Sequence, residues 1–535
     1  MLKKLSINMN ITSIKLIILT AIFWIAFANF SFFAALLNVY PLNAKNAPFL
    51  ATLSFCFPAV IIIFLSLFCF RRTIKPILIV LLISSSLAAY FMDTYNILID
   101  HLMISNSLET DTKEARDLLS ATMFSYLILL GVIPAIFVYR ANIIFQPFRR
   151  EVITRIKLIV SLLVIVLGLF FLQSGATASF FREHKPIRYY SNPANYIFGM
   201  GRHVGNIWRS VQSEKPLSPI ADDAKIPETD MGRELIIMVV GETARADRFS
   251  LNGYKRRTNP LLEKQDVVSF SDVESCGTST AISVPCMFSI DGADGFDKNE
   301  AKRKENALDV LKRVGVQVLW RDNNSSSKGV ADRVVYQNYR DPEINTICDD
   351  ECRDVGMLVG LQDYIDKQPE GDILIILHQM GNHGPAYYKR YPKEFEKFTP
   401  ACQTNELGDC STEEIDNAYD NAILYTDYFL NQVIELLKQN NKKFEVSMLY
   451  VSDHGESLGE NNIYLHGMPN WLAPESQRHV PMIMWLGSNF DELSIDELRA
   501  KKNTPITHDN IFHVLLGLME VESEVYKEDL DFISN

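Results

Sequence analysis

The sequence predicts a membrane protein of two parts: an N-terminal domain of five transmembrane helices and a C-terminal α/β domain with a doubly wound, mostly parallel sheet. Three observations lead to this prediction. Of the 535 residues, the first 180 carry 14 basic and 7 acidic side chains, whereas the other 355 carry 38 and 57, so the net charge changes from +7 to −19. Five charge-free stretches precede residue 180. Short apolar strands alternating with helical stretches follow it.

The overall composition excludes several classes of protein. Hydrophobic residues make up 48% of the chain and charged residues 22%, so neither intrinsic disorder nor a fibrous repeat fits. The acidic second part argues against non-specific nucleic-acid binding through a basic face.

Each of the five charge-free stretches is apolar enough to cross a membrane, for which about 20 residues suffice. They are Leu16–Leu37, Phe49–Phe70, Pro76–Met92, Leu118–Tyr139 and Leu158–Leu172. The alternative is five buried helices of a soluble protein. The first stretch resembles a signal peptide, but four more follow, so we interpret it as an uncleaved anchor.

The basic residues orient these helices. If the N-terminus is cytoplasmic, the three outside residues are Lys45, Lys113 and Arg116. The eleven inside residues are Lys3, Lys4, Lys15, Arg71, Arg72, Lys75, Arg140, Arg149, Arg150, Arg155 and Lys157. The positive-inside rule therefore predicts a cytoplasmic N-terminus, and five spans place the chain after residue 180 outside the cytoplasm.

The cysteines agree with this placement. Two of the eight, Cys56 and Cys69, lie in the second span. The other six form close pairs in the second part: Cys276 and Cys286, Cys348 and Cys352, Cys402 and Cys410. Zinc knuckles are the alternative, but two of the spacings are too wide for a knuckle. An oxidising compartment favours three disulfides, and local pairing is the simplest of the fifteen connectivities.

We therefore divide the chain into a transmembrane domain (1–179), a connecting segment (180–232) and an extracytoplasmic domain (233–535). The aromatic and basic stretch Phe180–Asn206 fits an interfacial helix and an ordinary bridging segment equally well. A polar linker follows from Ser213 to about Gly232.

The second part shows five buried-type strands with helical stretches between them, a pattern that indicates a parallel sheet. The strands are Leu235–Val240, Val316–Trp320, Ile373–Leu377, Val446–Val451 and Pro481–Leu486, and the longest helices are Ala301–Val314 and Glu413–Asn440. Ligands of such sheets bind beyond the carboxyl ends of the strands.

Polar side chains stand at those strand ends. Glu242 follows the first strand, Arg321-Asp322-Asn323 the second, His378 and His383 the third, and Asp453-His454 the fourth. Singly, each has an ordinary explanation: a first-turn acid for Glu242, a turn for Asp453-His454-Gly455, a surface imidazole for His383 or His466, and a helix cap for Thr280.

Together, two carboxylates, an imidazole and a hydroxyl can bind Zn²⁺ through oxygen and nitrogen. Zinc would ease ionisation of the Thr280 hydroxyl and so make it a nucleophile. A helix beginning at Thr280 also offers backbone N–H groups to a phosphate, so the roles of cap and nucleophile are compatible.

Four segments of the sequence form a recognisable set: Gly241-Glu242-Thr243-Ala244-Arg245-Ala246-Asp247-Arg248, Cys276-Gly277-Thr278-Ser279-Thr280, His378-x₄-His383-Gly384-Pro385 and Ser452-Asp453-His454-Gly455-Glu456. This set resembles the lipid A phosphoethanolamine transferases, a family that includes the mobile colistin-resistance enzymes. The resemblance covers essentially the whole chain. It implies five spans and a periplasmic zinc-dependent catalytic domain of alkaline-phosphatase-like fold.

The resemblance also implies a role for individual residues. Glu242, Thr280, Asp453 and His454 would bind zinc, and Thr280 would be the nucleophile that becomes phosphorylated. Three further residues would contact phosphoethanolamine or a second zinc ion: Lys328, His383 and His466. Two residues of the acidic loop after the third span, Asn106 and Glu114, resemble positions that bind the lipid donor.

The implied reaction moves phosphoethanolamine from phosphatidylethanolamine to a lipid A phosphate, with one Zn²⁺ at least as cofactor. The expected protein is a monomer in the bacterial inner membrane that binds these two lipids and no nucleic acid. Its product would be less negatively charged and would resist polymyxin and other cationic peptides. Related phosphodiesterases, sulfatases and glycerol-phosphate transferases are the rival reading, and a non-enzymatic binding or sensor protein is a further one.

Overall fold

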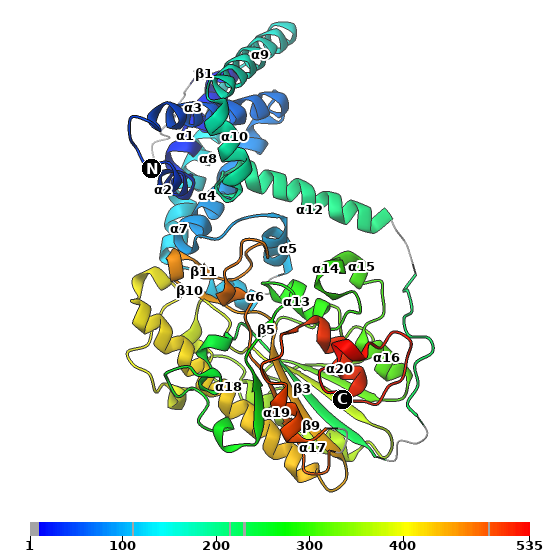
Figure 1. The fold of residues 1–535 in the computed structure, drawn as a ribbon. Helices are drawn as coiled ribbons and strands as arrows, with labels where there is room; N and C mark the ends of the chain where they lie inside the picture. The colour runs from blue at the N-terminus through cyan, green and yellow to red at the C-terminus, as the bar shows by residue number, and fades with distance from the viewer. Residues whose placement is uncertain (1–9, 110–111, 213–215, 228–231, 491–492, 535) are drawn as a thin grey trace, which may run out of the picture. The chain divides into compact units, whose positions relative to one another are not determined.

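The computed structural model describes residues 10–109, 112–212, 216–227, 232–490 and 493–534 (Figure 1). The chain forms two compact units. The first comprises Met1–Leu108 and Leu119–Ile207, and the second comprises Glu109–Leu118 and Trp208–Asn535. The short segment 109–118 therefore belongs to the second unit, although the helices before and after it belong to the first.

The first unit contains the predicted membrane helices. Three helices are long and apolar enough to cross a membrane: α3 (Ala47–Phe68), α4 (Ile74–Tyr95) and α9 (Phe148–Leu172). The fourth crossing, Ala121–Arg140, consists of α7 (Ala121–Tyr126), the π-helical η1 (Leu127–Val132) and α8 (Ile133–Arg140). The first predicted span is a pair of helices, α1 (Ser13–Phe27) and α2 (Phe30–Val39), bent by 60°. The number of spans is therefore four, or five if the bent pair counts as one.

Two buried amides satisfy the backbone at this bend. The Asn29 side chain donates to the carbonyls of Trp24 (2.9 Å) and Asn192 (2.7 Å). In return, Asn192 donates its side-chain amide to the Ala28 carbonyl (3.0 Å) and its backbone N–H to the Asn29 side chain (2.9 Å). Because a broken helix inside a membrane must pair its freed carbonyls within the protein, these contacts explain how the bend is tolerated.

The remaining elements of the first unit are short. They are α5 (His101–Glu109), α10 (Ser174–Glu183), α11 (Lys185–Tyr189), and a two-stranded pair of β1 (Asn10–Thr12) and β2 (Asn142–Ile144). The predicted connecting segment contains one long helix, α12 (Ala194–Gln212), which exposes the side chains of Phe198, Val204 and Trp208. Whether this face lies on the membrane stays a prediction.

A seven-stranded sheet organises the second unit, in the order β4-β12-β9-β3-β8-β6-β7. Its strands are β3 (Glu234–Gly241), β4 (Val267–Phe270), β6 (Gln317–Asp322), β7 (Val335–Asn338), β8 (Ile373–His378), β9 (Glu445–Ser452) and β12 (Met482–Leu486). Only β12 runs antiparallel to both of its neighbours among these strands. The predicted class, a mostly parallel α/β sheet, is confirmed.

Helices cover both faces of the sheet. One core cluster joins alternate residues of β3 (Ile236, Met238 and Val240) to α13 (Thr280–Met287), α16 (Ala307–Arg313) and α20 (Asp509–Gly517). The long helix α18 (Thr412–Asn440) packs against β9 from the opposite side, and Figure 1 shows the sheet between α18 and α20. Because both faces are buried, the strands carry continuous apolar runs.

The predicted helix Ala301–Val314 is wrong in its extent. It is divided into α15 (Lys298–Ala301) and α16 (Ala307–Arg313). Asn306 caps α16 through a capping box with Asp309, so a new helix begins there instead of continuing the first.

The six cysteines outside the first unit form the local pairs Cys276–Cys286, Cys348–Cys352 and Cys402–Cys410. Cys56 and Cys69 are free and buried in the first unit.

Candidate active site

The register of the sheet brings the predicted carboxylates together. In the parallel pair of β3 and β9, Gly241 lies opposite Ser452, so the next residues, Glu242 and Asp453, leave the sheet side by side. On the other side of β3, Val240 lies opposite His378. The strand ends that are far apart in sequence therefore form one rim, as expected for a parallel sheet.

Four predicted ligands meet at this rim. Glu242, Asp453 and His454 each present a ligand atom within 4.8 Å of the others, and all three are buried. The Thr280 hydroxyl lies 3.1 Å from Glu242 Oε2 and 3.4 Å from His454 Nε2. His454 Nε2 is also 3.4 Å from Asp453 Oδ2 and 3.5 Å from Glu242 Oε1. The structure thus gathers two carboxylates, one imidazole and one hydroxyl around a single point.

This donor set fits a zinc ion. His454 Nδ1 lies 2.9 Å from the Gly455 carbonyl, which can only accept, so Nδ1 carries the proton and Nε2 is available as a ligand. Burial, and secondarily the charge of His466, lowers the pKa of His454 well below its usual value, and neutral imidazole is the form that binds metals. Asp453 Oδ2 is buried and accepts no hydrogen bond from the residues that the structure describes, and burial raises the pKa of its carboxyl. A bound cation would compensate that burial.

The local backbone holds these ligands in place. Thr243 adopts a positive φ of 51°, an uncommon conformation for a β-branched residue, and its N–H donates to Asp453 Oδ1 at 3.2 Å. The next N–H, at Ala244, donates to the Ser452 hydroxyl at 2.8 Å. Thr280 is the first residue of α13, after Ser279 in an extended conformation. The hydroxyl therefore lies at a helix N-terminus, where phosphate oxygens are favoured.

Two further predicted histidines lie next to this group. The rings of His466 and His454 have centroids 4.3 Å apart, and those of His383 and His466 are 5.6 Å apart. Burial, together with the charge of His466, lowers the pKa of His383 well below its usual value. His378, by contrast, does not join the group: its Nδ1 lies 3.0 Å from Asp322 Oδ2, and both residues are fully buried.

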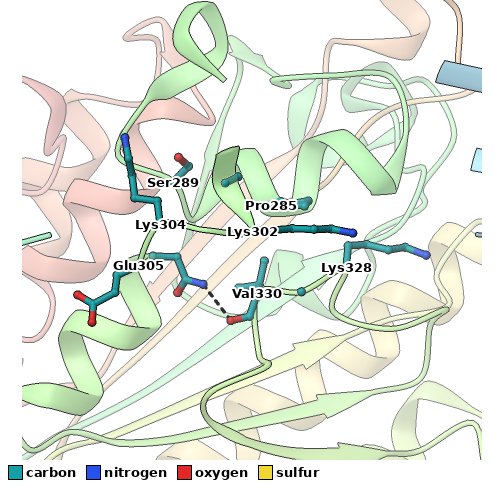
Figure 2. Close-up of a pocket in the computed structure, with 10 residues that line it drawn as sticks. Pro285, Ser289, Lys302, Lys304, Glu305, Lys328 and Val330 are labelled. Carbon is teal, nitrogen blue, oxygen red and sulfur yellow. Dashed lines mark hydrogen bonds between the residues drawn. The ribbon is translucent and has the colours of Figure 1, made fainter. Parts of the chain in front are cut away.

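Lys328 lies in a loop that is connected to the group through Asn324. Its ammonium group donates to the carbonyl (3.0 Å) and hydroxyl (2.7 Å) of Ser325. It lines a small pocket together with Pro285 of α13 and several residues between 301 and 306, and Figure 2 shows Lys302 and Lys328 extended in the same direction. No direct contact between Lys328 and the four gathered ligands is found among the described residues.

The two predicted donor-binding residues are on the short loop helices. Asn106 lies on α5 in the first unit, and Glu114 lies on α6 (Thr112–Asp117) in the second. The side chain of Glu114 falls outside the described part of the structure. Both assignments stay predictions.

The sequence interpretation missed two residues that support the site. Asn324 donates to Glu242 Oε2 at 2.6 Å, which orients a ligand carboxylate. Glu456, fully buried, lies 3.0 Å from His466 Nδ1 and accepts from the Tyr387 hydroxyl at 3.0 Å. Both residues belong to polar runs after β6 and β9, so their position at strand ends was the available signal.

The comparisons with known proteins agree with this geometry. A family model described as "Sulfatase" matches residues 234–521, and one described as "Phosphoethanolamine transferase EptA/EptB" matches residues 57–206. The fold and the site thus define a membrane protein with a sulfatase-type domain.

The relatives narrow this class. The chain is 44% identical to phosphatidylethanolamine transferase Mcr-1 from Escherichia coli, over 98% of each sequence. It is 38% identical to phosphoethanolamine transferase EptA from Escherichia coli K12, over 100% of this chain and 98% of EptA. The solved lipooligosaccharide phosphoethanolamine transferase A of Neisseria meningitidis, an integral membrane protein, superposes with a TM-score of 0.93 and 33% identity, over 98% of this chain and 99% of the other. The chain belongs to the phosphoethanolamine transferase family.

Proposed function

We propose that this protein transfers phosphoethanolamine from phosphatidylethanolamine to a phosphate of lipid A through a covalent intermediate on Thr280. The observation that carries the proposal is the position of the Thr280 hydroxyl, 3.1 Å from Glu242 and 3.4 Å from His454 in a buried site. The family relationship supports phosphoethanolamine as the transferred group.

Glu242, Thr280, Asp453 and His454 are the residues that we propose hold Zn²⁺. When bound, zinc would lower the pKa of a coordinated hydroxyl and stabilise negative charge on phosphoryl oxygens. His383 and His466, the two neighbouring histidines, are the residues that could hold a second ion or contact the substrate instead.

In the first half-reaction, Thr280 Oγ1 gives its proton to Glu242 Oε2, 3.1 Å away, and forms a bond to the donor phosphorus while the bond from phosphorus to the glycerol oxygen breaks. Diacylglycerol leaves after its oxygen takes a proton. We propose His466 as the donor of this proton. Its Nδ1 lies 3.0 Å from Glu456, so Nε2 points away from that carboxylate. In the second half-reaction, a lipid A phosphate oxygen attacks the phosphorus on Thr280, the bond from phosphorus to Oγ1 breaks, and Oγ1 takes its proton back from Glu242.

The consequence for the acceptor is electrostatic. The product is a diphosphate diester, whose two phosphates carry about as much negative charge as the original phosphomonoester, and the ethanolamine adds a positive ammonium group that lowers the net negative charge. Cationic peptides such as polymyxin are attracted to anionic lipid surfaces, so modified lipid A should bind them less tightly.

The placement in the cell follows from the same proposal. The first unit spans the inner membrane with a cytoplasmic N-terminus, because eleven of the fourteen basic residues among the first 180 then lie inside. The second unit is periplasmic, and its three disulfides suit that oxidising compartment. We propose that the protein acts as a monomer on its two lipids.

Mass spectrometry of lipid A from otherwise identical cells with and without the protein tests the proposal. We expect a mass increase of one phosphoethanolamine unit only where the protein is present. An increase of one glycerol phosphate would instead assign the chain to the glycerol-phosphate transferases. Unmodified lipid A in cells that contain the intact protein would refute the proposed transfer.

A further inference from the structure

A buried arginine outside the zinc-binding group connects three separate segments of the second unit. The Arg390 side chain, 1% exposed, follows the short helix η6 (Tyr387–Lys389). Its Nε donates to the His383 carbonyl at 2.6 Å, its Nη1 to the Glu351 carboxylate, and its Nη2 to Asp117 Oδ2 at 2.8 Å. The three nitrogens of the guanidinium group therefore each donate to a different segment of the chain.

Asp117 reaches this arginine from the segment 109–118. Its side chain is 10% exposed, and its second oxygen accepts from Lys389 Nζ at 2.5 Å. Its backbone carbonyl accepts from the Asn405 side chain at 2.6 Å. Burial raises the pKa of Asp117, but the charge of Arg390 and its bonds to Lys389 and Arg390 outweigh burial, so the pKa lies below its usual value and the carboxylate is ionised.

Two disulfide-closed loops supply the remaining partners. Glu351 lies between Cys348 and Cys352, and Asn405 lies between Cys402 and Cys410. Arg353, just after the first of these loops, donates to the Lys389 carbonyl at 2.6 Å. Two of the segments that contact Asp117 and Arg390 are thus closed by disulfides, which restricts their backbones.

A buried ion pair of this kind is weak evidence for stability, because desolvation of both charges offsets much of their attraction. What it fixes here is the position of Asp117 relative to the backbone of His383. The segment 109–118 continues directly from α5, which carries Asn106, and leads to the membrane crossing at Ala121–Arg140. Arg390 also donates to the backbone carbonyl of His383, whose ring lies next to that of His466.

We propose that Asp117 is a positioning residue for the lipid donor: through Arg390 and Lys389 it holds the loop that contains α6 (Thr112–Asp117) beside the loop of His383, within the second unit. This inference rests on the proposed function. A lipid donor arrives from the membrane, and a loop that is connected to the membrane helices at both ends is suited to guide its head group. Docking this loop should therefore matter for a membrane-bound donor and much less for a small soluble one.

The test uses the full-length protein with phosphatidylethanolamine vesicles and, separately, a water-soluble phosphoethanolamine ester. Asp117→Asn removes the charge with little change of shape, and Asp117→Glu restores it. We expect Asp117→Asn to raise KM for the vesicle donor about tenfold, with the soluble ester affected less than about twofold and the zinc content unchanged. Asp117→Glu should recover most of the loss, and Lys389→Met should cause a smaller rise in KM.

Hydrogen exchange provides a readout that does not depend on turnover. Amides 112–120 and 383–391 should exchange faster in Asp117→Asn than in the wild type. Glu263→Gln is the matched control, because it removes an exposed ion pair with Arg257 elsewhere on the unit, and it should change nothing.

Unchanged KM and unchanged exchange in Asp117→Asn would overturn the inference. So would a parallel loss of activity on both donors with loss of zinc, because that pattern indicates a general folding defect. Wild-type protein that fails to modify lipid A would contradict the proposed function instead, and the exchange comparison would still decide whether Asp117 docks the loop.

Discussion

At the scale of single residues, Thr280 combines two properties, its place at a helix start and its place among buried acidic groups. It is the first residue of a helix, where backbone N–H groups face outward, and its hydroxyl lies in a buried group of two carboxylates and an imidazole. The helix end favours an incoming phosphoryl group, whereas the carboxylates alone would repel it. Only with a cation between them do these features cooperate, which is why nucleophile and metal belong to one hypothesis.

Thr280→Ala tests the nucleophile. Loss of the hydroxyl removes the covalent step, so we expect transfer to fall by at least about a thousandfold, whereas Thr280→Ser should retain part of it. The measurement is the mass of lipid A product, together with the mass of the tryptic peptide that contains residue 280 after incubation with donor. Thr504→Ala, at an exposed position, is the control. Wild-type transfer by Thr280→Ala would exclude this mechanism.

The metal assignment makes a graded prediction. Glu242→Ala or Asp453→Ala removes a proposed ligand and should abolish stoichiometric zinc binding. Asn324→Ala removes only the amide that donates to Glu242 at 2.6 Å, so zinc affinity should weaken by about 10- to 100-fold. Elemental analysis and chelator competition measure both effects without an activity assay. Equal zinc affinity in all three variants and the wild type would contradict the assignment.

At the scale of elements, the buried strands were predictable because a strand covered on both faces leaves a continuous apolar run in the sequence. The run at Leu235–Val240 is the clearest example, and its strand is fully buried. The direction of a strand leaves no such mark. The segment Pro481–Leu486 has the same apolar pattern as the other predicted strands, yet β12 runs antiparallel to β9. Its direction is decided by tertiary pairing. Two peripheral strands, β4 and β7, are only four residues long and partly exposed, so they give little signal.

The same reasoning explains which residues of the site could be predicted from the sequence. Glu242 and Asp453 each lie two positions after a predicted strand, so a parallel sheet must bring them to one edge. Arg390 and Asp117 are 273 positions apart in the chain, and no local pattern relates them. Asn324 is one of several polar residues after β6, and only the folded loop distinguishes it from its neighbours.

Helix α18 carries a carboxylate that should make stability depend on pH. Asp427 is fully buried and accepts the N–H groups of Leu261 (2.9 Å) and Leu262 (3.0 Å). Burial raises its pKa to about 7, above the value of about 3.9 expected in the unfolded chain. Between these two values the folded state binds more protons, so the contribution of Asp427 is fully present below about pH 4 and is lost as pH rises to about 7.

Urea unfolding of the wild type and Asp427→Asn at several pH values measures this effect, because asparagine does not titrate. The unfolding free energy of the wild type should fall relative to that of Asp427→Asn as the pH rises from about 4 to about 7, and the difference should then remain constant. A difference that does not vary with pH would show that the Asp427 pKa is close to that of an ordinary carboxyl group.

At the scale of the whole molecule, the oxidation state of the cysteines tests the compartment that we propose for each unit. The six disulfide-bonded residues belong to the second unit, and Cys56 and Cys69 belong to the first. Alkylation before and after reduction should therefore distinguish the two groups of cysteines. The six cysteines between positions 276 and 410 should react only after reduction. Non-reducing peptide mapping should find the three local pairs. Free thiols at these positions in protein from cells with normal periplasmic oxidation would contradict the proposed topology.

The division into two units predicts that the chemistry and the handling of lipids can be separated by experiment. All four proposed zinc ligands, the core cluster of the sheet and the three disulfides lie after residue 213. A fragment that starts at Ser213 should therefore fold and bind zinc. It lacks the segment 109–118, however, and with it the carboxylate of Asp117 that neutralises Arg390 and Lys389.

We expect this fragment to cleave a soluble phosphoethanolamine ester slowly and to modify lipid A in vesicles poorly. Holding the nucleophile at the membrane surface raises its effective concentration near the lipid head groups, and that advantage is worth several orders of magnitude at best. The measurement is the rate on each substrate for the fragment and for the full chain, with zinc content matched. If the two modify lipid A equally well, the membrane unit is only an anchor, and the loop that carries Asn106 and Glu114 has no part in binding the donor.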